Sequence, residues 1–77
     1  MKIGKVTGSV WATRKAENLS GQTFLVVDTV QGTIVASDLV GAGTGDRVLL
    51  VLGEPAARFC MEAPVDAVVV AILDSEK

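Results

Sequence analysis

The sequence predicts an all-β protein, a small five-stranded closed barrel with one short helix, formed as a single domain over residues 1–77. Three observations lead to this fold class. Valine, isoleucine and threonine dominate the apolar runs, and these residues favour strands. The glycines fall between the runs, where turns are expected. The runs recur at roughly 8–12 residues, which is the strand spacing of small sandwiches and barrels.

The first two strands differ in their apolar pattern. The run Ile3–Thr13 alternates loosely, and its alternation places Val6 and Val10 on the same face. Residues 14–22 are polar and are expected to form a connection. The run Thr23–Val30 is nearly continuous in apolar character, so we expect this second strand to be buried on both faces.

Two more strands flank a loop rich in glycine. Gln31–Gly32 is expected to turn the chain into a third strand, Thr33–Ala36, as a β-hairpin. Residues 38–46 then form a glycine-dense loop, and Arg47–Leu52 is the fourth strand.

A short helix and a fifth strand complete the predicted barrel. The segment Ala56–Met61 is rich in helix formers. Pro55 suits the first helical turn, where its missing N–H costs nothing, and Glu54 lies favourably at the positive end of the helix dipole. Pro64 ends the helix, and Val65–Asp74 forms the last strand.

The composition predicts a homo-oligomer. Of the 77 residues, 49% are hydrophobic and only 21% are charged, and the mean hydropathy is +0.48. A chain of this size buries only roughly 60% of the surface that its unfolded form exposes. One cysteine cannot form a disulfide framework. A core shared between subunits is therefore the simplest way to cover the apolar surplus.

The composition also argues against several classes of function. The chain has no histidine, so imidazole acid/base chemistry and metal sites containing histidine are excluded. A net charge of −2 and a pI near 4.8 disfavour general nucleic-acid binding. Its apolar runs are far shorter than the roughly 20 residues of a membrane span. We therefore expect a soluble cytoplasmic protein that binds no cofactor, metal, nucleic acid or membrane.

Four features of the sequence are candidates for chemistry. Residues 41–45 suggest a phosphate-binding loop, but a strand follows where such a loop needs a helix N-terminus, so we interpret the glycines as allowing positive φ or close backbone approach. No spacing brings two carboxylates into one cleft, and Cys60 has no histidine to activate it. Trp11 shares a polar face with Lys5, Thr7 and Ser9, which leaves single-stranded nucleic-acid binding as an alternative function. A tryptophan that anchors a subunit interface is the better interpretation.

Three segments resemble one known family. They are the opening Gly4–Lys15 (GKVTGSVWATRK), the block Ala36–Val48 (ASDLVGAGTGDRV) and the end Pro64–Asp74 (PVDAVVVAILD). Together they are similar, in order and over nearly the whole chain, to the bacterial microcompartment vertex proteins, the group that includes the ethanolamine-utilisation and carboxysome pentamers. The chain departs from the family at Gly53–Arg58, which keeps the glycine, alanines and arginine of a G-S-S-A-R loop but has neither serine.

The resemblance implies both an assembly and a function. It implies an oligonucleotide-binding-like (OB-like) barrel in a cyclic homopentamer that caps the vertices of a polyhedral shell in the bacterial cytoplasm. Such a protein has no catalytic role, and its partners are itself and hexameric shell proteins. With Trp11, the residues that we expect at a subunit interface or pore are Gly41, Gly43, Gly45, Gly53, Glu54, Pro55, Ala56, Ala57 and Arg58.

Overall fold

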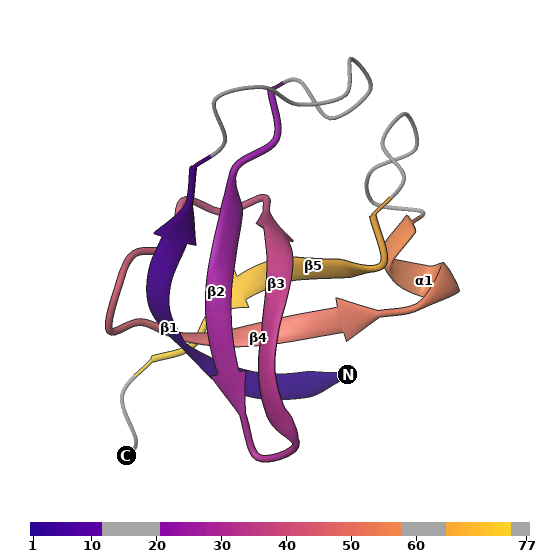
Figure 1. Ribbon diagram of the computed structural model, residues 1–77. Helices are drawn as coiled ribbons and strands as arrows, with labels where there is room; N and C mark the ends of the chain where they lie inside the picture. Colours follow the sequence, from indigo (N-terminus) through magenta and orange to yellow (C-terminus); the bar gives the residue numbers. More distant parts are fainter. Residues whose placement is uncertain (12–20, 58–64, 75–77) are drawn as a thin grey trace.

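The valine-rich runs form the strands of a closed five-stranded barrel (Figure 1). The computed structural model describes residues 1–11, 21–57 and 65–74. Within them the prediction of an all-β barrel is confirmed. The elements are β1 (Lys2–Val10), β2 (Phe24–Thr29), β3 (Gly32–Asp38), β4 (Arg47–Leu52), the single helical turn α1 (Glu54–Ala57) and β5 (Ala67–Ile72).

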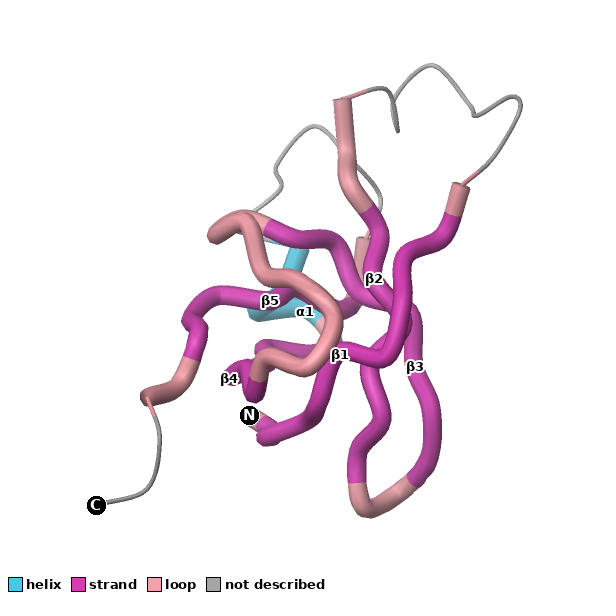
Figure 2. The backbone as a smooth tube through the Cα atoms, turned by 90° about the vertical axis from the view of Figure 1, so that its left-hand side faces the viewer, coloured by secondary structure: helices cyan, strands magenta, loops and turns pink. Residues whose placement is uncertain are grey.

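The barrel closes in the order β1-β2-β3-β5-β4, in agreement with the OB-like topology that the resemblance implies. Most neighbouring strands are antiparallel, but β3 and β5 are parallel and pair only at Ser37↔Val68 and Asp38↔Val69. The long strand β1 pairs with β4 through its first half and with β2 through its second half. The barrel thus has two walls, β2–β3 and β4–β5, which cross at a steep angle and lie on opposite sides (Figures 1 and 2).

The core fills the space between these walls. Alternate positions of each strand point inward, as the two-residue period of a strand requires. The principal cluster consists of Val6, Leu25, Val27, Ala36, Val48, Leu50, Ala67 and Val69, all at most 5% exposed. A second, small cluster lies where α1 covers the outer face of β4 and β5, and it consists of Val51, Ala56 and Val68. The helical turn therefore closes one part of the outer surface of the barrel.

Burial on both faces of β2 was predicted, and in the protomer this prediction is wrong. Leu25 and Val27 are buried, whereas Phe24 and Val26 are only half-buried. The inner face of β2 packs into the core, but no other element among residues 1–11, 21–57 and 65–74 fully covers its outer face. The continuous apolar run therefore exceeds what the described part of the barrel buries.

The alternation predicted for β1 is also interrupted. Val6 is 1% exposed, but Val10 is 41% exposed. A β-bulge between Val6 and Gly8 shifts the register against β2, so the residues beyond it no longer follow the inward positions before it. Positions 12 and 13, which were expected to continue this strand, lie outside the described residues.

The predicted strands and helix occur in the expected order, and some of their ends differ. The fourth strand has the predicted bounds, and the hairpin is confirmed, although Val30–Gln31 forms its turn and Gly32 already pairs with Thr29. Strand β3 extends to Asp38 because its end pairs with β5, a contact between distant parts of the chain. Strand β5 is shorter than predicted. Helix α1 starts at Glu54, and positions 58–64 lie outside the described residues.

Gly4 marks the point where β1 passes closest to β2. An added Cβ there would lie 2.5 Å from Val27 Cγ1 and 2.8 Å from the backbone oxygen of Asp28. Carbon atoms in proteins do not approach so closely without displacing a neighbour. The lack of a side chain therefore lets β1 bend from one wall of the barrel to the other.

Candidate functional site

The glycine-dense loop, residues 39–46, is held at its start by one carboxylate. Asp38 Oδ1 accepts hydrogen bonds from the backbone N–H groups of Val40, at 3.0 Å, and Gly41, at 3.2 Å. Asp38 Oδ2 accepts a third from the N–H of Ala42, at 3.0 Å. One side chain thus supplies the partners that backbone donors in a loop lack. The shape of this end of the loop is fixed within the protomer.

A second carboxylate holds the far end of the loop against β1. Asp46 Oδ2 accepts a hydrogen bond from the N–H of Gly43 at 2.8 Å. The N–H of Gly45 donates to the oxygen of Val6 at 2.8 Å, and the N–H of Val6 donates to the oxygen of Asp46 at 2.9 Å. The acidic residues that flank the loop thus make local hydrogen bonds, as acids in turns commonly do.

The glycines of this loop are not equivalent. Gly41 has φ of 78° and Gly45 has φ of 96°, conformations that residues with a side chain rarely adopt. The interpretation that the glycines allow positive φ is therefore confirmed at these two positions. Gly43 does not have positive φ, and the nearest atom to an added Cβ would be Asp46 Oδ2 at 4.0 Å. The protomer alone therefore has room for a side chain at Gly43.

The segment after β4 lies at the other end of that strand from the glycine-dense loop (Figure 1). The N–H of Gly53 donates to the oxygen of Asp66 at 2.7 Å, which ties the residue before α1 to the residue before β5. Pro55 is exposed, whereas Ala56 is 0% exposed and packs against Val51 and Val68. One protomer therefore does not bring the two predicted interface segments together. The side chains of Glu54 and Ala57 are not described, and Arg58 and Cys60 lie outside the described residues.

Trp11 projects into solvent directly after β1. It is 90% exposed, and Val10 before it is 41% exposed. A large aromatic side chain in this position loses most of its contact with water when a partner covers it. Its predicted role as an interface anchor remains a prediction.

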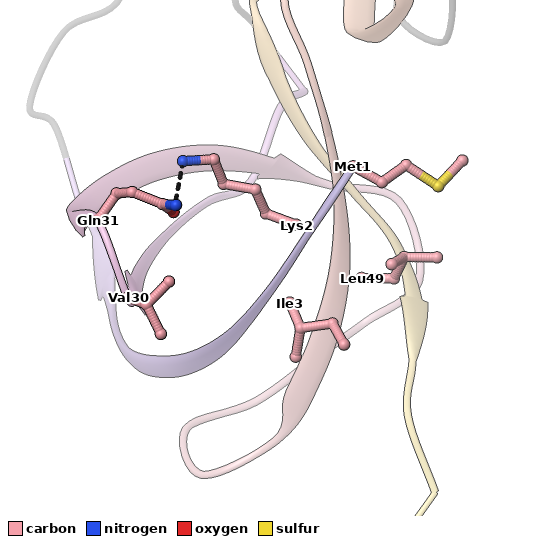
Figure 3. Close-up of a pocket in the computed structure, with 6 residues that line it drawn as sticks. All are labelled: Met1, Lys2, Ile3, Val30, Gln31 and Leu49. Carbon is pink, nitrogen blue, oxygen red and sulfur yellow. Dashed lines mark hydrogen bonds between the residues drawn. The ribbon is translucent and has the colours of Figure 1, made fainter.

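An apolar groove lies beside the N-terminus, and the sequence reasoning did not identify it (Figure 3). Its volume is about 440 Å³. Ile3 lies between Val30 and Leu49, and Lys2 Nζ donates to Gln31 Oε1 at 2.7 Å across one side. The lining residues are Met1, Lys2, Ile3, Val30, Gln31 and Leu49.

Two apolar residues at outward or turn positions mark this groove. Ile3 occupies an outward position of β1, as Lys5 does, because Gly4 and Val6 between and beyond them are buried. Outward positions of an antiparallel barrel usually carry polar residues. Val30 occupies a hairpin turn, where polar residues and glycine are usual, and it is 94% exposed. Apolar residues at such positions indicate a surface that a partner covers.

The described residues contain no group of three or more histidine, cysteine, aspartate or glutamate side chains placed to hold a metal ion. In the same part of the chain, no helix has both the length and the apolar character needed to cross a membrane. The candidate functional site is therefore the outer surface of the barrel. It comprises the glycine-dense loop, the apolar groove and the exposed aliphatic side chains.

Comparison with known families identifies the chain. The family described as "Ethanolamine utilisation protein EutN/carboxysome" matches residues 1–74. The chain belongs to this family. This member of the EutN/carboxysome family is 44% identical to the carboxysome shell vertex protein CcmL of Synechococcus elongatus, over 97% of this chain and 85% of that protein. It is 39% identical to the bacterial microcompartment shell vertex protein EutN of Escherichia coli, over 96% of this chain and 87% of that protein.

Solved structures of family members have the same barrel. CcmL of Nostoc superimposes with a TM-score of 0.90 at 37% identity, covering 99% of this chain and 92% of that one. GrpN of Rhodospirillum rubrum, a pentameric microcompartment shell protein, superimposes with a TM-score of 0.86 at 39% identity, covering 100% and 98%. The resemblance predicted from the sequence motifs is therefore confirmed, and the relatives of this chain are structural shell vertex proteins.

Proposed function

We propose that this chain forms a homopentamer that caps the vertices of a polyhedral bacterial microcompartment shell. One observation carries the proposal. The GrpN structure is 39% identical over the whole of this chain, superimposes with a TM-score of 0.86, and is that of a pentameric microcompartment shell protein. The proposed role is structural and involves no catalysis.

The exposed apolar surface supports an oligomer. Met1, Trp11 and Val30 are each 87% or more exposed, and further aliphatic side chains are about half exposed. A soluble monomer rarely presents contiguous apolar patches of several hundred Å². A ring of five copies gives each protomer two neighbours, so two parts of this surface become buried.

The position of the ring in a shell follows from geometry. Hexagonal units tile a flat sheet, and a closed polyhedron made from such sheets needs five-fold units at its corners. We therefore propose hexameric shell proteins as the partners of the ring, and the shell itself, within the bacterial cytoplasm, as its location. This role uses the rim of the ring for contact and needs no substrate.

The loop and the turn that the sequence singled out have proposed places in the ring. The loop of Gly41, Gly43 and Gly45 is pre-shaped by Asp38 and exposed along much of its length, which suits a close backbone contact near a subunit boundary or pore. Gly53 and the exposed Pro55 are proposed for the same region of a neighbouring protomer. Trp11 is proposed as an anchor of the subunit interface.

The test of the assembly is the native mass in solution, measured by light scattering on a sizing column and by native mass spectrometry. We expect a mass near five times 8.0 kDa. A monomer over a wide concentration range contradicts the proposal. A dimer or a hexamer keeps the fold but excludes the vertex role.

The test of the shell partners is co-expression with hexameric shell proteins. We expect closed polyhedral particles when this chain is present, and particles with open corners or extended sheets when it is left out. Electron microscopy of the purified particles distinguishes these results. Closed shells of the same shape in both samples contradict the vertex role.

A further inference from the structure

A ring of five copies needs two different contact surfaces on each protomer. In a cyclic assembly larger than a dimer the interface is heterologous, so one patch meets a different patch on the next copy. If the chain forms the proposed pentamer, two surfaces of each protomer must make that contact. The described part of the barrel carries two outward apolar patches, on opposite walls.

The first surface, the groove patch, is concave and consists of Met1, Ile3, Val30 and Leu49. Met1 is 87%, Ile3 52% and Val30 94% exposed, and Leu49 is half-buried at the base. Ile3 and Leu49 are directly paired across β1 and β4, so their side chains share one face. The patch therefore lies on the wall formed by β4, with the tip of the β2–β3 hairpin as its other side (Figure 3).

The second surface, the sheet patch, lies on the opposite wall and consists of Val10, Val26 and Val35. Val26 and Val35 are directly paired across β2 and β3. Val35 is 52% and Val10 41% exposed, and Val26 is half-buried. This is the outer face of β2, which the other described elements leave only half-buried. Gly8 is paired with Val26 and has no side chain, so this face is flat beside the valines.

A row of polar residues separates the two patches. The strand register places Arg47 opposite Lys5, Lys5 opposite Asp28, and Asp28 opposite Thr33. All four residues are exposed. Polar side chains commonly surround the apolar centre of an interface. The row therefore makes the groove patch and the sheet patch two separate surfaces.

The exposed large apolar side chains supply about half of the apolar surface that a ring requires. Each protomer in a ring makes two contacts, and a standard interface buries about 800 Å² per partner, of which roughly 60% is apolar, so about 1,000 Å² of apolar surface is needed. Nine large hydrophobic residues in the described part of the chain are 40–94% exposed. At roughly 60–100 Å² for a fully exposed aliphatic side chain and 150–250 Å² for the tryptophan, they present about 500 Å². Five of the nine belong to the two patches.

We propose that the groove patch of each protomer packs against the sheet patch of the next protomer around the ring. The two surfaces differ in shape, one concave and one flat, and they lie on opposite walls of the barrel. Each contact leaves a free groove patch on one copy and a free sheet patch on the other. The addition of copies continues until the ring closes.

Two substitutions test the two surfaces separately. Ile3→Glu places a charge in the groove patch, and Val35→Glu places one in the sheet patch. The two residues form a matched pair, because both are β-branched strand residues and both are 52% exposed. We expect each variant alone to be a monomer of 8.0 kDa by native mass spectrometry. Each lacks one half of every contact that the ring needs.

The decisive measurement is a mixture of the two variants. The Ile3→Glu protein keeps an intact sheet patch, and the Val35→Glu protein keeps an intact groove patch, so one good contact remains between them. We expect a 1:1 heterodimer of twice 8.0 kDa and no larger species. Formation of this heterodimer also shows that both variants are folded. A mixture that stays monomeric, or a variant that still forms a pentamer alone, overturns the pairing of these two patches.

Further variants control for loss of folding and for a general effect of added charge. If either glutamate variant is unfolded by circular dichroism, Ile3→Thr and Val35→Thr replace it, and each is expected to raise the concentration at half-assembly at least about tenfold. An unchanged midpoint overturns the inference.

Asp66→Lys changes the charge at an exposed position outside both patches and is expected to remain a pentamer. An unsubstituted chain that is itself monomeric contradicts the proposed pentamer instead.

Discussion

Substitution of Gly4 by alanine tests how the barrel is closed. The structure places the added methyl group 2.5 Å from Val27 Cγ1, 2.8 Å from the backbone oxygen of Asp28 and 3.3 Å from Thr29 Cγ2. Gly8, on the same strand, provides a matched control, since an added Cβ there has no heavy atom within 4 Å. Neither glycine has positive φ, so the two alanine variants differ in crowding and not in backbone strain.

The expected effect of Gly4→Ala is a loss of stability. Val27 is 0% exposed, and the oxygen of Asp28 belongs to the backbone of β2, so neither can move without disturbing the core or the sheet. Overpacking of this kind costs about 1–3 kcal/mol. The smaller conformational freedom of alanine in the unfolded chain returns about 0.4–1 kcal/mol. The net loss is about 1–2 kcal/mol, and for a small domain this lowers the Tm by about 5–15 °C.

The assay is thermal and urea unfolding of both variants by circular dichroism. The protomer concentration is held fixed, because assembly adds to the apparent stability. Gly8→Ala is expected to stay within about 1 kcal/mol of the unsubstituted protein or to exceed it slightly. Equal stabilities for the Gly4→Ala and Gly8→Ala proteins would refute the close approach of β1 to β2 at Gly4.

Three further predictions concern the loop and the tryptophan. Asp38→Ala removes the acceptor of three backbone hydrogen bonds, so we expect the free energy of unfolding to fall by about 1–3 kcal/mol and amide hydrogen exchange at residues 40–42 to become faster. Exchange at the original rate would contradict the role of Asp38 in holding the loop. Gly45→Ala forces a side chain into φ of 96° and should cost about 1–2 kcal/mol, whereas Gly43→Ala should be close to neutral in the isolated protomer; unfolding midpoints measured at low concentration compare them, and equal losses refute the difference. Trp11 is 90% exposed in the protomer, so its fluorescence emission should shift to shorter wavelength when the protein concentration is raised and the ring assembles. Quenching by a single-stranded oligonucleotide would instead favour the alternative function of single-stranded nucleic-acid binding.

The sequence predicted the strands well because their signals are local. Runs rich in valine, with glycine or polar residues between them, are visible in any short window, and Arg47–Leu52 has its predicted bounds. The errors have non-local causes. Strand β3 extends to Asp38 through its pairing with β5, some 30 residues away in sequence, and the bulge in β1 depends on the register of β2. Such features depend on which strands become neighbours.

The candidate site was predicted only in part for the same reason. The glycine-dense loop was found because glycines stand out in a sequence, and Gly41 and Gly45 do have positive φ. The groove was missed because Ile3, Val30 and Leu49 come from three separate segments that the closed barrel brings together. Ile3 taken alone is an ordinary strand residue. Its outward position became evident once Gly4 and Val6 were seen to be buried.

The way in which β1 spans the barrel has a mechanical consequence. Its first half pairs with β4 and its second half pairs with β2, so one covalently continuous strand of nine residues joins the two walls. A tensile load applied between the walls acts along the backbone of β1 and shears its hydrogen bonds together, instead of peeling them apart one by one. If neighbouring subunits pull on opposite walls, five such strands form a nearly continuous hoop. The stiffness of a shell corner under osmotic stress would then depend mainly on β1, and only weakly on the loops.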